Sequence, residues 1–387
     1  MIAALFWGAT ATIVYTLVVF PIVTLARAVL RPRPYRQADI MPSVSVVLAA
    51  RNEAAVIEAK VDNLGAVDYP ADCLQVVIAS DGSDDETVRL ARSRAAADVV
   101  VLDLPRVGKA AALQAAVDAS TGDVLVFTDA NSMFRPDAIR RLVRALADEE
   151  VGGVAGNQVY AEDASDDSTA VGERSYWDFD RAIKRAQSDA GNVIAATGAI
   201  YAIRRELFRP IPAGVTDDFY LSLAVIDAGK RLVFDPSAVA VERVASSRTR
   251  EYGRKVRIMT RGLRCVAVMR QLLDPRRTGF YAVELFSHKV LMRTMAVPLL
   301  VAFVTSLALA PRNGLYALAA WLQTAFYGLA AVGTLLAGSV AGTRRFVSLP
   351  AYFCLVQVAS LHAAWNLLRG NQVERWEPTR SSPETRR

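Results

Sequence analysis

Two short acidic segments, each directly after an apolar run typical of a buried β-strand, constrain the fold of this chain most. Ser80–Asp85 reads SDGSDD and follows LQVVIA, and Thr128–Asn131 reads TDAN and follows DVLVF. In an open parallel α/β sheet, ligands bind in the crevice at the carboxyl ends of the strands. Carboxylates at two such ends can hold a nucleotide base or ribose and a divalent cation. The two segments therefore predict a parallel α/β sheet with a nucleotide- and cation-binding edge.

Strand-like and helix-like segments alternate around these loops, as a doubly wound sheet requires. The expected strands are 43–50, 75–80, 99–102, 124–128, 151–160 and 199–203, and the expected helices are 53–64, 84–95, 109–119, 136–147, 172–185 and 217–228. The first strand is followed by Ala50–Glu53, which lacks the G-x-G-x-x-G fingerprint of dinucleotide dehydrogenases. A nucleotide-sugar enzyme is therefore favoured over an oxidoreductase.

The composition predicts that part of the chain lies in a membrane. Of the 387 residues 53% are hydrophobic and 22% are charged, and the mean hydropathy is +0.24. The chain is thus too apolar for an ordinary soluble enzyme, yet charged enough to face water in part. Uncharged runs near the ~20 residues that cross a bilayer as a helix are 1–26, 294–310, 314–341 and 346–368. Four crossings are expected.

Arginines next to these runs predict the orientation. Four of them follow the first run, at 27, 31, 33 and 36, which favours a retained anchor over a cleaved signal peptide. By the positive-inside rule they keep residues 31–290 in the cytoplasm, and Arg344 and Arg345 agree. Four crossings place the tail from Arg369 outside, although it is also arginine-rich. Either one run is re-entrant or the tail charges do not dominate.

The charge distribution limits the classes of partner that this chain is expected to bind. The formal net charge is +6, and the arginines gather beside the apolar runs and between residues 243 and 277. Anionic lipid head groups and nucleotides explain this pattern better than nucleic acid. A basic helical pattern covers 248–273, and 280–295 has the two-faced pattern of a helix lying in the interface. The three cysteines are scattered, which predicts no disulfide framework or zinc site and fits a reducing cytoplasm.

Six motifs in order resemble those of a membrane-bound inverting family 2 glycosyltransferase, a group related to polysaccharide synthases and ceramide glucosyltransferase-like enzymes. They are AARNE (49–53), SDGSDD (80–85), GKAAALQAA (108–116), TDAN (128–131), TGAIYAIRRELF (197–208) and TDD (216–218). SHKVLMR (287–293) and WEPTR (376–380) resemble stretches of membrane-bound members. Taken singly, an acidic turn such as Asp81 or Asp129 is equally explained as a helix cap or turn residue. All six in order favour the functional interpretation.

The resemblance implies a GT-A fold, a nucleoside-diphosphate sugar donor and Mg²⁺ or Mn²⁺. It implies roles for the following residues: Ala50, Asn52 and Glu53 line the nucleotide pocket, Asp81 holds the base, Lys109 approaches the pyrophosphate, Thr197 and Gly198 contact the acceptor, and Asp129 and Asn131 hold the metal. Asn131 stands where the DxD motif has its second carboxylate, so the cation meets one negative ligand fewer. The diphosphate is then expected to hold most of it.

The general base can be argued from the residue types available. Inverting transfer needs a group that takes the proton of the acceptor hydroxyl. Both histidines, His288 and His362, lie in segments assigned to the interface or the membrane, so a carboxylate remains. Asp217 and Asp218 begin a helix, where the macrodipole favours ionised acids. The resemblance assigns the base to Asp218, whereas the alternative makes Thr216 and Asp217 ordinary capping residues.

One departure from the family bears on the product. Arg254 and Arg257 lie where processive members carry QxxRW and are expected to contact the diphosphate, but the tryptophan is absent. Tyr252 or Trp177 is the candidate to replace the aromatic platform of that tryptophan. The alternative interpretation of Arg254 and Arg257 is that they belong to a basic helix bound to the membrane surface. The absence favours a single transfer or short products over long polymers.

The expected domains are a membrane anchor (1–30), a cytoplasmic GT-A domain (40–275), an interfacial helix (276–295), three transmembrane helices (296–368) and a tail (369–387). The expected activity is transfer of a sugar from a UDP- or GDP-sugar, with inversion, to a lipid-linked or glycan acceptor. The expected location is the plasma membrane of a bacterium, with lipids and no nucleic acid as partners. A processive polysaccharide synthase and a non-catalytic membrane scaffold are the alternatives.

Overall fold

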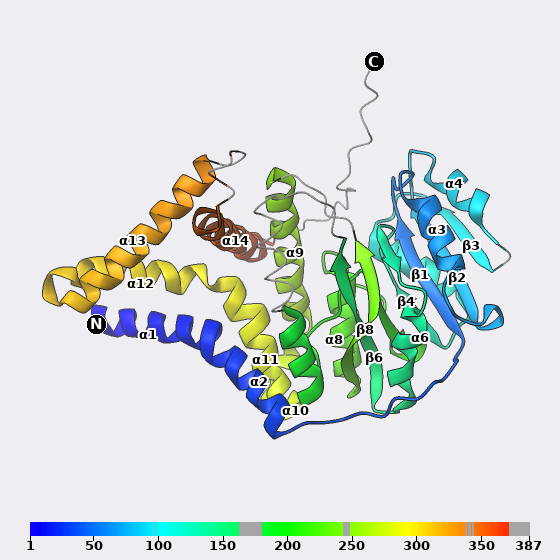
Figure 1. Cartoon of the computed structure of the whole chain (residues 1–387), viewed down its shortest axis with the longest axis horizontal. Coiled ribbons are helices and arrows are strands. Elements are labelled where there is room, and N and C mark those ends of the chain that lie inside the picture. Colours follow the sequence, from blue (N-terminus) through cyan, green and yellow to red (C-terminus); the bar gives the residue numbers. More distant parts are fainter. Residues whose placement is uncertain are drawn as a thin grey trace, which may run out of the picture. The chain divides into compact units, whose positions relative to one another are not determined.

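A computed structural model describes residues 1–96, 98–161, 180–242, 248–336, 339, 342 and 344–370 (Figure 1). By internal contacts the chain divides into two units. The sheet unit contains residues 28–163 and 184–246, and the helical unit contains residues 1–27 and 247–373 together with 164–183. Three sequence predictions lie outside the described residues: most of the helix 172–185, Trp177, and the WEPTR stretch with the tail beyond 370.

The sheet unit is built on one eight-stranded sheet in the order β3-β2-β1-β4-β7-β6-β8-β5. The strands are β1 (Val44–Ala50), β2 (Leu74–Asp81), β3 (Val99–Leu104), β4 (Val124–Phe127), β5 (Ser132–Phe134), β6 (Val151–Tyr160), β7 (Tyr201–Arg204) and β8 (Arg231–Glu242). The four strands from β3 to β4 are parallel, whereas β7 is antiparallel to both of its neighbours. The α/β class is confirmed, and the sheet is mixed.

Helices pack on this sheet and explain its apolar strands. They are α3 (Ile57–Gly65), α4 (Thr87–Arg94), α5 (Lys109–Asp118), α6 (Ala138–Arg144), α8 (Asp217–Asp227) and the helical residues 184–190. Every residue of β1, VSVVLAA, is buried, because a central parallel strand has both faces covered. Apolar residues of α3 and α6 join β1, β2 and β4 in the main hydrophobic core. This packing sets the strand ends that carry the acidic loops at one edge.

Strands β5 and β8 are absent from the elements expected from the sequence. Asp235-Pro236 in the middle of β8 has the composition of a turn, yet the strand continues through it. The pairing of β8 with β6 shifts register there, between Ala155 and Asn157, so the missing Pro236 amide breaks no regular ladder. β8 also completes the far side of the sheet by pairing with β5.

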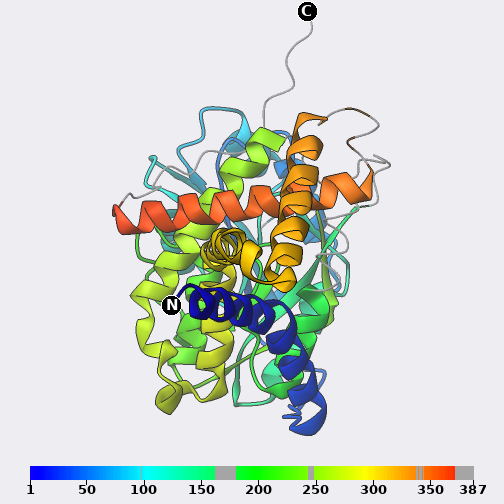
Figure 2. The ribbon, with the colours of Figure 1, turned by 90° about the vertical axis from the view of Figure 1, so that its left-hand side faces the viewer.

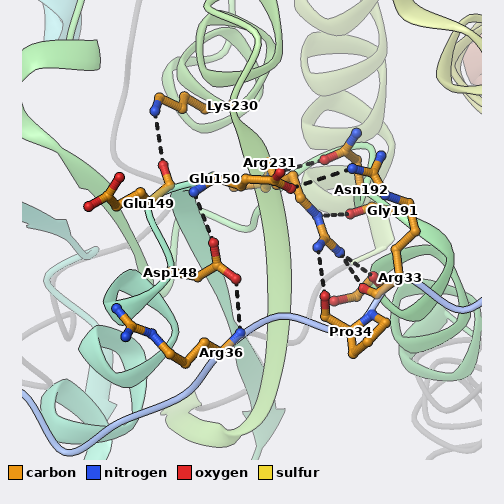
Figure 3. Close-up of polar contacts among 12 residues, drawn as sticks. Arg33, Pro34, Arg36, Asp148, Glu149, Glu150, Gly191, Asn192, Lys230 and Arg231 are labelled. Carbon is orange, nitrogen blue, oxygen red and sulfur yellow. Dashed lines mark hydrogen bonds and ion pairs between the residues drawn. The ribbon is translucent and has the colours of Figure 1, made fainter.

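The segment that leads from α2 (Phe20–Leu30) to β1 is tied to the sheet unit by Arg231 (Figure 3). The Arg231 guanidinium is buried and donates to the backbone oxygens of Arg33, Pro34, Ser188 and Gly191 at 2.8–3.4 Å. Nearby, the Arg36 amide donates to Asp148 at 2.9 Å. The connecting segment is therefore part of the folded unit.

The helical unit contains the apolar helices (Figure 2). Its elements include α1 (Ile2–Val14), a π-helical turn (Tyr15–Val19), α9 (Arg248–Val268), α10 (Pro275–Thr278), α11 (Phe280–Leu285), α12 (Ala296–Leu309), α13 (Gly314–Leu335) and α14 (Arg345–Leu368). Helix α12 packs against α1, and α14 packs against α13 and α9. Many large apolar side chains on these helices are exposed, Trp7, Trp321 and Leu335 among them.

Within the described part of the chain, three helices are long and apolar enough to cross a membrane, namely Ile2–Leu30, Gly314–Leu335 and Arg345–Leu368. Two further helices, Phe280–Thr294 and Ala296–Arg312, form a bent pair with an angle of 55° between them. If this pair counts as one span, the number of candidate spans is four. The run expected to cross at 294–310 is the second arm of this pair, and the expected interfacial helix is its first arm. The boundaries at 30, 40, 275, 295 and 368 stay predictions.

Candidate active site

Lys109 brings together two acidic segments that are far apart in the sequence. It is the first residue of α5, and its ammonium lies 3.1 Å from Asp129 Oδ1, just beyond β4, and 3.1 Å from Asp217 Oδ2, the first residue of α8. All three side chains are partly exposed. The ends of one strand and two helices therefore meet in a cluster of charged side chains.

The two carboxylates keep Lys109 charged. Burial by itself would lower the pKa of Lys109, but Asp129 and Asp217 outweigh it and raise the pKa above its ordinary value. A cation at the first position of a helix opposes the helix dipole. The ion pairs with Asp129 and Asp217 compensate for that position.

Asp218 follows Asp217 in the chain and has a raised pKa. Burial and the neighbouring Asp217 raise the pKa of Asp218 from 3.8 to about 6, while Lys109 and the Phe219 amide act in the opposite direction. The Phe219 amide donates to Asp218 Oδ1 at 2.7 Å. A carboxylate with a pKa near 6 is ionised at neutral pH and is more basic than an exposed aspartate. Thr216 takes the N-cap position of α8 without a side-chain capping hydrogen bond, and Asp217 and Asp218 lie in the first turn of the helix.

Asp81 fixes the loop that precedes Lys109. It is 1% exposed, and its Oδ1 accepts hydrogen bonds from the amides of Val107 and Gly108, each at 2.7 Å. Gly82 has a φ of +59°, and a Cβ there would lie 2.8 Å from the Arg106 amide nitrogen, so only glycine fits. Asp81 thus connects β2 to the start of α5. Its expected contact with the base stays a prediction.

The first loop is joined to the second by hydrogen bonds between backbone amides and side-chain oxygens. Ala50 is buried at the end of β1. The Asn52 amide donates to Ser83 Oγ at 3.1 Å, and Asn52 Oδ1 accepts from the Asp84 amide at 2.9 Å. The Glu53 amide donates to Thr87 Oγ1 at 2.8 Å. The residues expected to line the nucleotide pocket therefore lie at neighbouring strand ends, as the sequence predicted.

Asp129 and Asn131 offer oxygen ligands on one loop. The Asn131 amide nitrogen donates to Glu242, which also accepts from Gln158, so the Asn131 oxygen is turned away from that carboxylate. One carboxylate and one amide oxygen suit Mg²⁺ or Mn²⁺ when ligand phosphates complete the shell. Among the described residues, no group of three or more His, Cys, Asp or Glu side chains is placed to hold a metal ion. The donor set therefore fits a cation that arrives with a diphosphate.

The residues expected to contact the acceptor lie against the same loop. A Cβ on Gly198 would lie 3.0 Å from Asp129 Oδ2, so the absence of a side chain lets the two loops approach. The Thr197 hydroxyl is buried and has no hydrogen-bond partner in the described part of the chain. Arg254 and Arg257 belong to α9 in the helical unit, where burial and the adjacent Arg261 and Arg254 lower the pKa of Arg257.

Two residues near this site, Arg51 and Lys60, were not predicted from the sequence. Arg51 is buried, with Nη2 3.5 Å from Asp84, and its Nε and Nη1 have no hydrogen-bond partner among the described residues. Lys60 is fully buried on α3. The available signal for Lys60 was its position three residues after Ile57 and four before Leu64, on the apolar face of an amphipathic helix.

Comparison with known proteins identifies the family to which this region belongs. Residues 45–211 match Glycosyl transferase family 2, a range that includes Asp81, Lys109, Asp129 and the loop at 197–198. This stretch is a family 2 glycosyltransferase domain. The match ends before Asp217 and Asp218.

Curated relatives of the glycosyltransferase domain have one name. An N-acetylglucosaminyltransferase of Rhizobium sp. (strain N33) is 29% identical over 222 residues, which is 53% of this chain and 49% of the relative. Its counterpart in Rhizobium meliloti (strain 1021) is 28% identical over 216 residues, 51% of this chain and 50% of the relative. The chain thus spans about half the length of the curated relatives that it matches.

A solved structure resembles the chain over almost its whole length. It is a mannosyltransferase from Pyrobaculum calidifontis in complex with GDP-Man and Mn²⁺, with a TM-score of 0.72 at 24% identity, covering 96% of this chain and 100% of that one. At this identity the likeness concerns the fold. The GT-A glycosyltransferase fold expected from the sequence is confirmed.

Proposed function

We propose that this protein is a membrane-bound glycosyltransferase that transfers a sugar from a UDP- or GDP-sugar to a lipid-linked or glycan acceptor, with inversion at the anomeric carbon. The observation that carries the proposal is the double ion pair of Lys109 with Asp129 and Asp217. It joins the expected donor-binding loop to the helix start that carries the expected base.

In the proposed reaction, the acceptor hydroxyl attacks the anomeric carbon from the face opposite the diphosphate. Asp218 takes the hydroxyl proton as the new glycosidic bond forms, and the bond from carbon to diphosphate oxygen breaks. Its pKa of about 6 suits that role, because the group is ionised at neutral pH and gains basicity from partial desolvation. Asp217 holds Lys109 beside the leaving diphosphate.

Asp129 and Asn131 are the residues that would hold Mg²⁺ or Mn²⁺, which neutralises charge on the diphosphate when bound. The mannosyltransferase of similar fold was solved with Mn²⁺ and GDP-Man, and the curated relatives are named for transfer of N-acetylglucosamine. These names support a nucleotide-sugar donor and a divalent cation. They also make UDP-N-acetylglucosamine and GDP-mannose the first donors to test.

The membrane part of the proposal rests on the three apolar helices and the bent pair. Basic residues beside the first helix support a cytoplasmic sheet unit in a bacterial plasma membrane. An acceptor on a lipid carrier suits an enzyme held at that surface. Lipids are the proposed partners besides donor and acceptor.

The proposal is tested by release of nucleoside diphosphate from each donor with Mn²⁺, in the wild type and in Asp218→Asn. Loss of the base is expected to lower the rate by about 10²–10⁴-fold, with the affinity for the nucleotide kept. Asp227→Asn is the matched control, because Asp227 lies on the same helix but pairs with Arg209 at 2.7 Å. Equal release by wild type and Asp218→Asn would contradict the assignment.

Product analysis separates the alternatives. A single transfer or short products are expected because the tryptophan of the QxxRW motif is absent. A ladder of long chains would instead identify a processive synthase. Nucleotide binding without turnover of any donor would identify a non-catalytic scaffold.

A further inference from the structure

Lys60 places a positive charge behind the loop that carries Asp129. Its side chain is 0% exposed, and its ammonium donates to Thr128 Oγ1 at 2.9 Å and to the Ser132 backbone oxygen. The same nitrogen lies 4.3 Å from the centre of the Phe134 ring. All three contacts are thus made with the segment 128–134, which contains both expected metal ligands.

Thr128 connects the Lys60 ammonium to a second loop. Its hydroxyl accepts from Lys60 and donates to the Ala199 backbone oxygen at 2.9 Å. Ala199 follows Gly198, which packs directly against Asp129. One buried ammonium therefore connects the metal-binding loop with the loop expected to contact the acceptor.

Burying this ammonium is costly, although it donates to Thr128 Oγ1 and to the Ser132 backbone oxygen. Burial lowers the pKa of Lys60 to about 7, with Asp129 acting in the opposite direction, so holding the charge there costs free energy. Apolar residues of similar volume often replace buried charges without loss of stability, and sometimes with a gain. The surrounding core of α3 would accept such a residue, since Ile57, Val61 and Leu64 are all buried.

We propose that Lys60 is a positioning residue for donor binding: it holds the 128–132 segment and, through Thr128, the 197–199 loop in the arrangement that receives the diphosphate and its cation. This inference rests on the proposed function. Lys60 itself touches no substrate. Its ammonium acts through Thr128 and Ser132 on the placement of Asp129, Asn131 and Gly198.

Asn63, one turn further along α3, provides a matched control. Its side chain donates to the Phe134 backbone oxygen at 2.8 Å and accepts from the Phe134 amide at 2.7 Å. Asn63 thus holds the far end of the same strand without carrying a charge or contacting Thr128. A general loosening of β5 would follow equally from Asn63→Leu and from Lys60→Met.

The first measurement is hydrogen exchange of the full-length protein without ligand. Lys60→Met is expected to speed amide exchange in both 128–132 and 197–200 by about tenfold or more. Asn63→Leu is expected to speed exchange only around residue 134. If Lys60→Met does not fold, Thr128→Val keeps the lysine, removes the relay and is expected to speed exchange at 197–200.

The second measurement is the dissociation constant of UDP and of GDP, each with Mn²⁺. Lys60→Met is expected to weaken the nucleotide that binds the wild type by about tenfold or more, whereas Asn63→Leu leaves it within about twofold. A melting temperature of Lys60→Met equal to or above that of the wild type, together with the weaker binding, would support positioning over a structural role.

Each outcome decides a separate point. Unchanged exchange in 128–132 and 197–200, or unchanged nucleotide affinity in Lys60→Met, would overturn the assignment. Equal effects of Asn63→Leu would also overturn it, because the charge would then carry no special role. A wild type that binds neither nucleotide would contradict the proposed function, and the exchange measurement would still decide whether Lys60 holds both loops.

Discussion

At the scale of single residues, the site is a balance of opposite charges in partly buried positions. Lys109 pairs with Asp129 and Asp217, and Lys60 lies behind the same loop. Burial and the neighbouring Asp217 raise the pKa of Asp218 to about 6. Asp129 and Asp217 each pair with the Lys109 ammonium, and we propose Asp218 as the group that accepts a proton.

The raised pKa predicts how the rate depends on pH. Asp218 must be ionised to act as base, so kcat/KM is expected to fall as the pH drops below about 6, approaching tenfold per pH unit. The measurement is kcat/KM for donor and acceptor between about pH 5 and 8. A profile that stays flat down to about pH 5 would contradict the role of Asp218.

The same shift predicts the stability of Asp218→Asn. Because the folded-state pKa lies above the ordinary 3.8, ionisation of Asp218 disfavours the fold, and stability is lost as the pH rises through this window to about 6. Asp218→Asn removes that cost and is expected to raise the free energy of unfolding at neutral pH, by at most about 3 kcal/mol. Thermal unfolding at about pH 7.5 and about pH 4 checks this, with no gain expected at the lower pH. A lower melting temperature at pH 7.5 would indicate a structural role instead.

At the scale of elements, short connections transmit the sheet geometry to the functional side chains. Asp81 at the end of β2 fixes the residues before α5, and α3 holds the segment after β4. Elsewhere in the sheet unit, Arg231 at the start of β8 binds the segment before β1 (Figure 3). Asp81 and Arg231 satisfy backbone groups of loops that have no regular partner of their own, and Lys60 donates to a backbone oxygen of β5.

Removal of the Arg231 guanidinium is therefore expected to destabilise the sheet unit. Arg231→Met leaves four backbone oxygens without this donor and should cost roughly 2–4 kcal/mol. Thermal unfolding and faster proteolysis within residues 31–43 would show it. Arg33→Gln is the control, because the Arg33 guanidinium makes an exposed pair with Glu150 at 3.5 Å that should contribute less than about 1 kcal/mol.

At the scale of the whole molecule, an α/β sheet unit and an apolar helical unit share one chain. Helices α1, α13 and α14 expose large apolar side chains such as Trp7, Trp321 and Leu368, which in water would be an aggregation hazard. In the proposed membrane-bound state, a bilayer removes this surface from water. The basic helix α9 belongs to the same unit and suits contact with anionic head groups.

This predicts the behaviour of the protein on fractionation. The full-length chain is expected to stay in the membrane pellet after alkaline carbonate and to be released only by detergent, because burial of each span is far more favourable than electrostatic attachment. Immunoblots of the fractions measure it. Release by carbonate or high salt would show peripheral attachment and contradict the crossings.

The strands β1 to β4, the acidic loops at their ends and the apolar runs follow from the sequence alone, because each is a local pattern of hydrophobicity and turn residues. Strand β8 does not, since Asp235-Pro236 has the local signal of a turn and only pairing with β6 and β5 keeps it extended. Resemblance to a family suggested Asp218, but its raised pKa depends on burial beside Asp217.

What the sequence by itself determined was the α/β class, the separate apolar helices and the identity of the acidic residues at the strand ends. The tertiary structure decided that Lys109 lies between Asp129 and Asp217, and that Lys60 sits buried behind their loop. The reason is physical: hydrophobic periodicity acts over a few residues, whereas distances between charges and the desolvation of a side chain arise only when remote segments pack together.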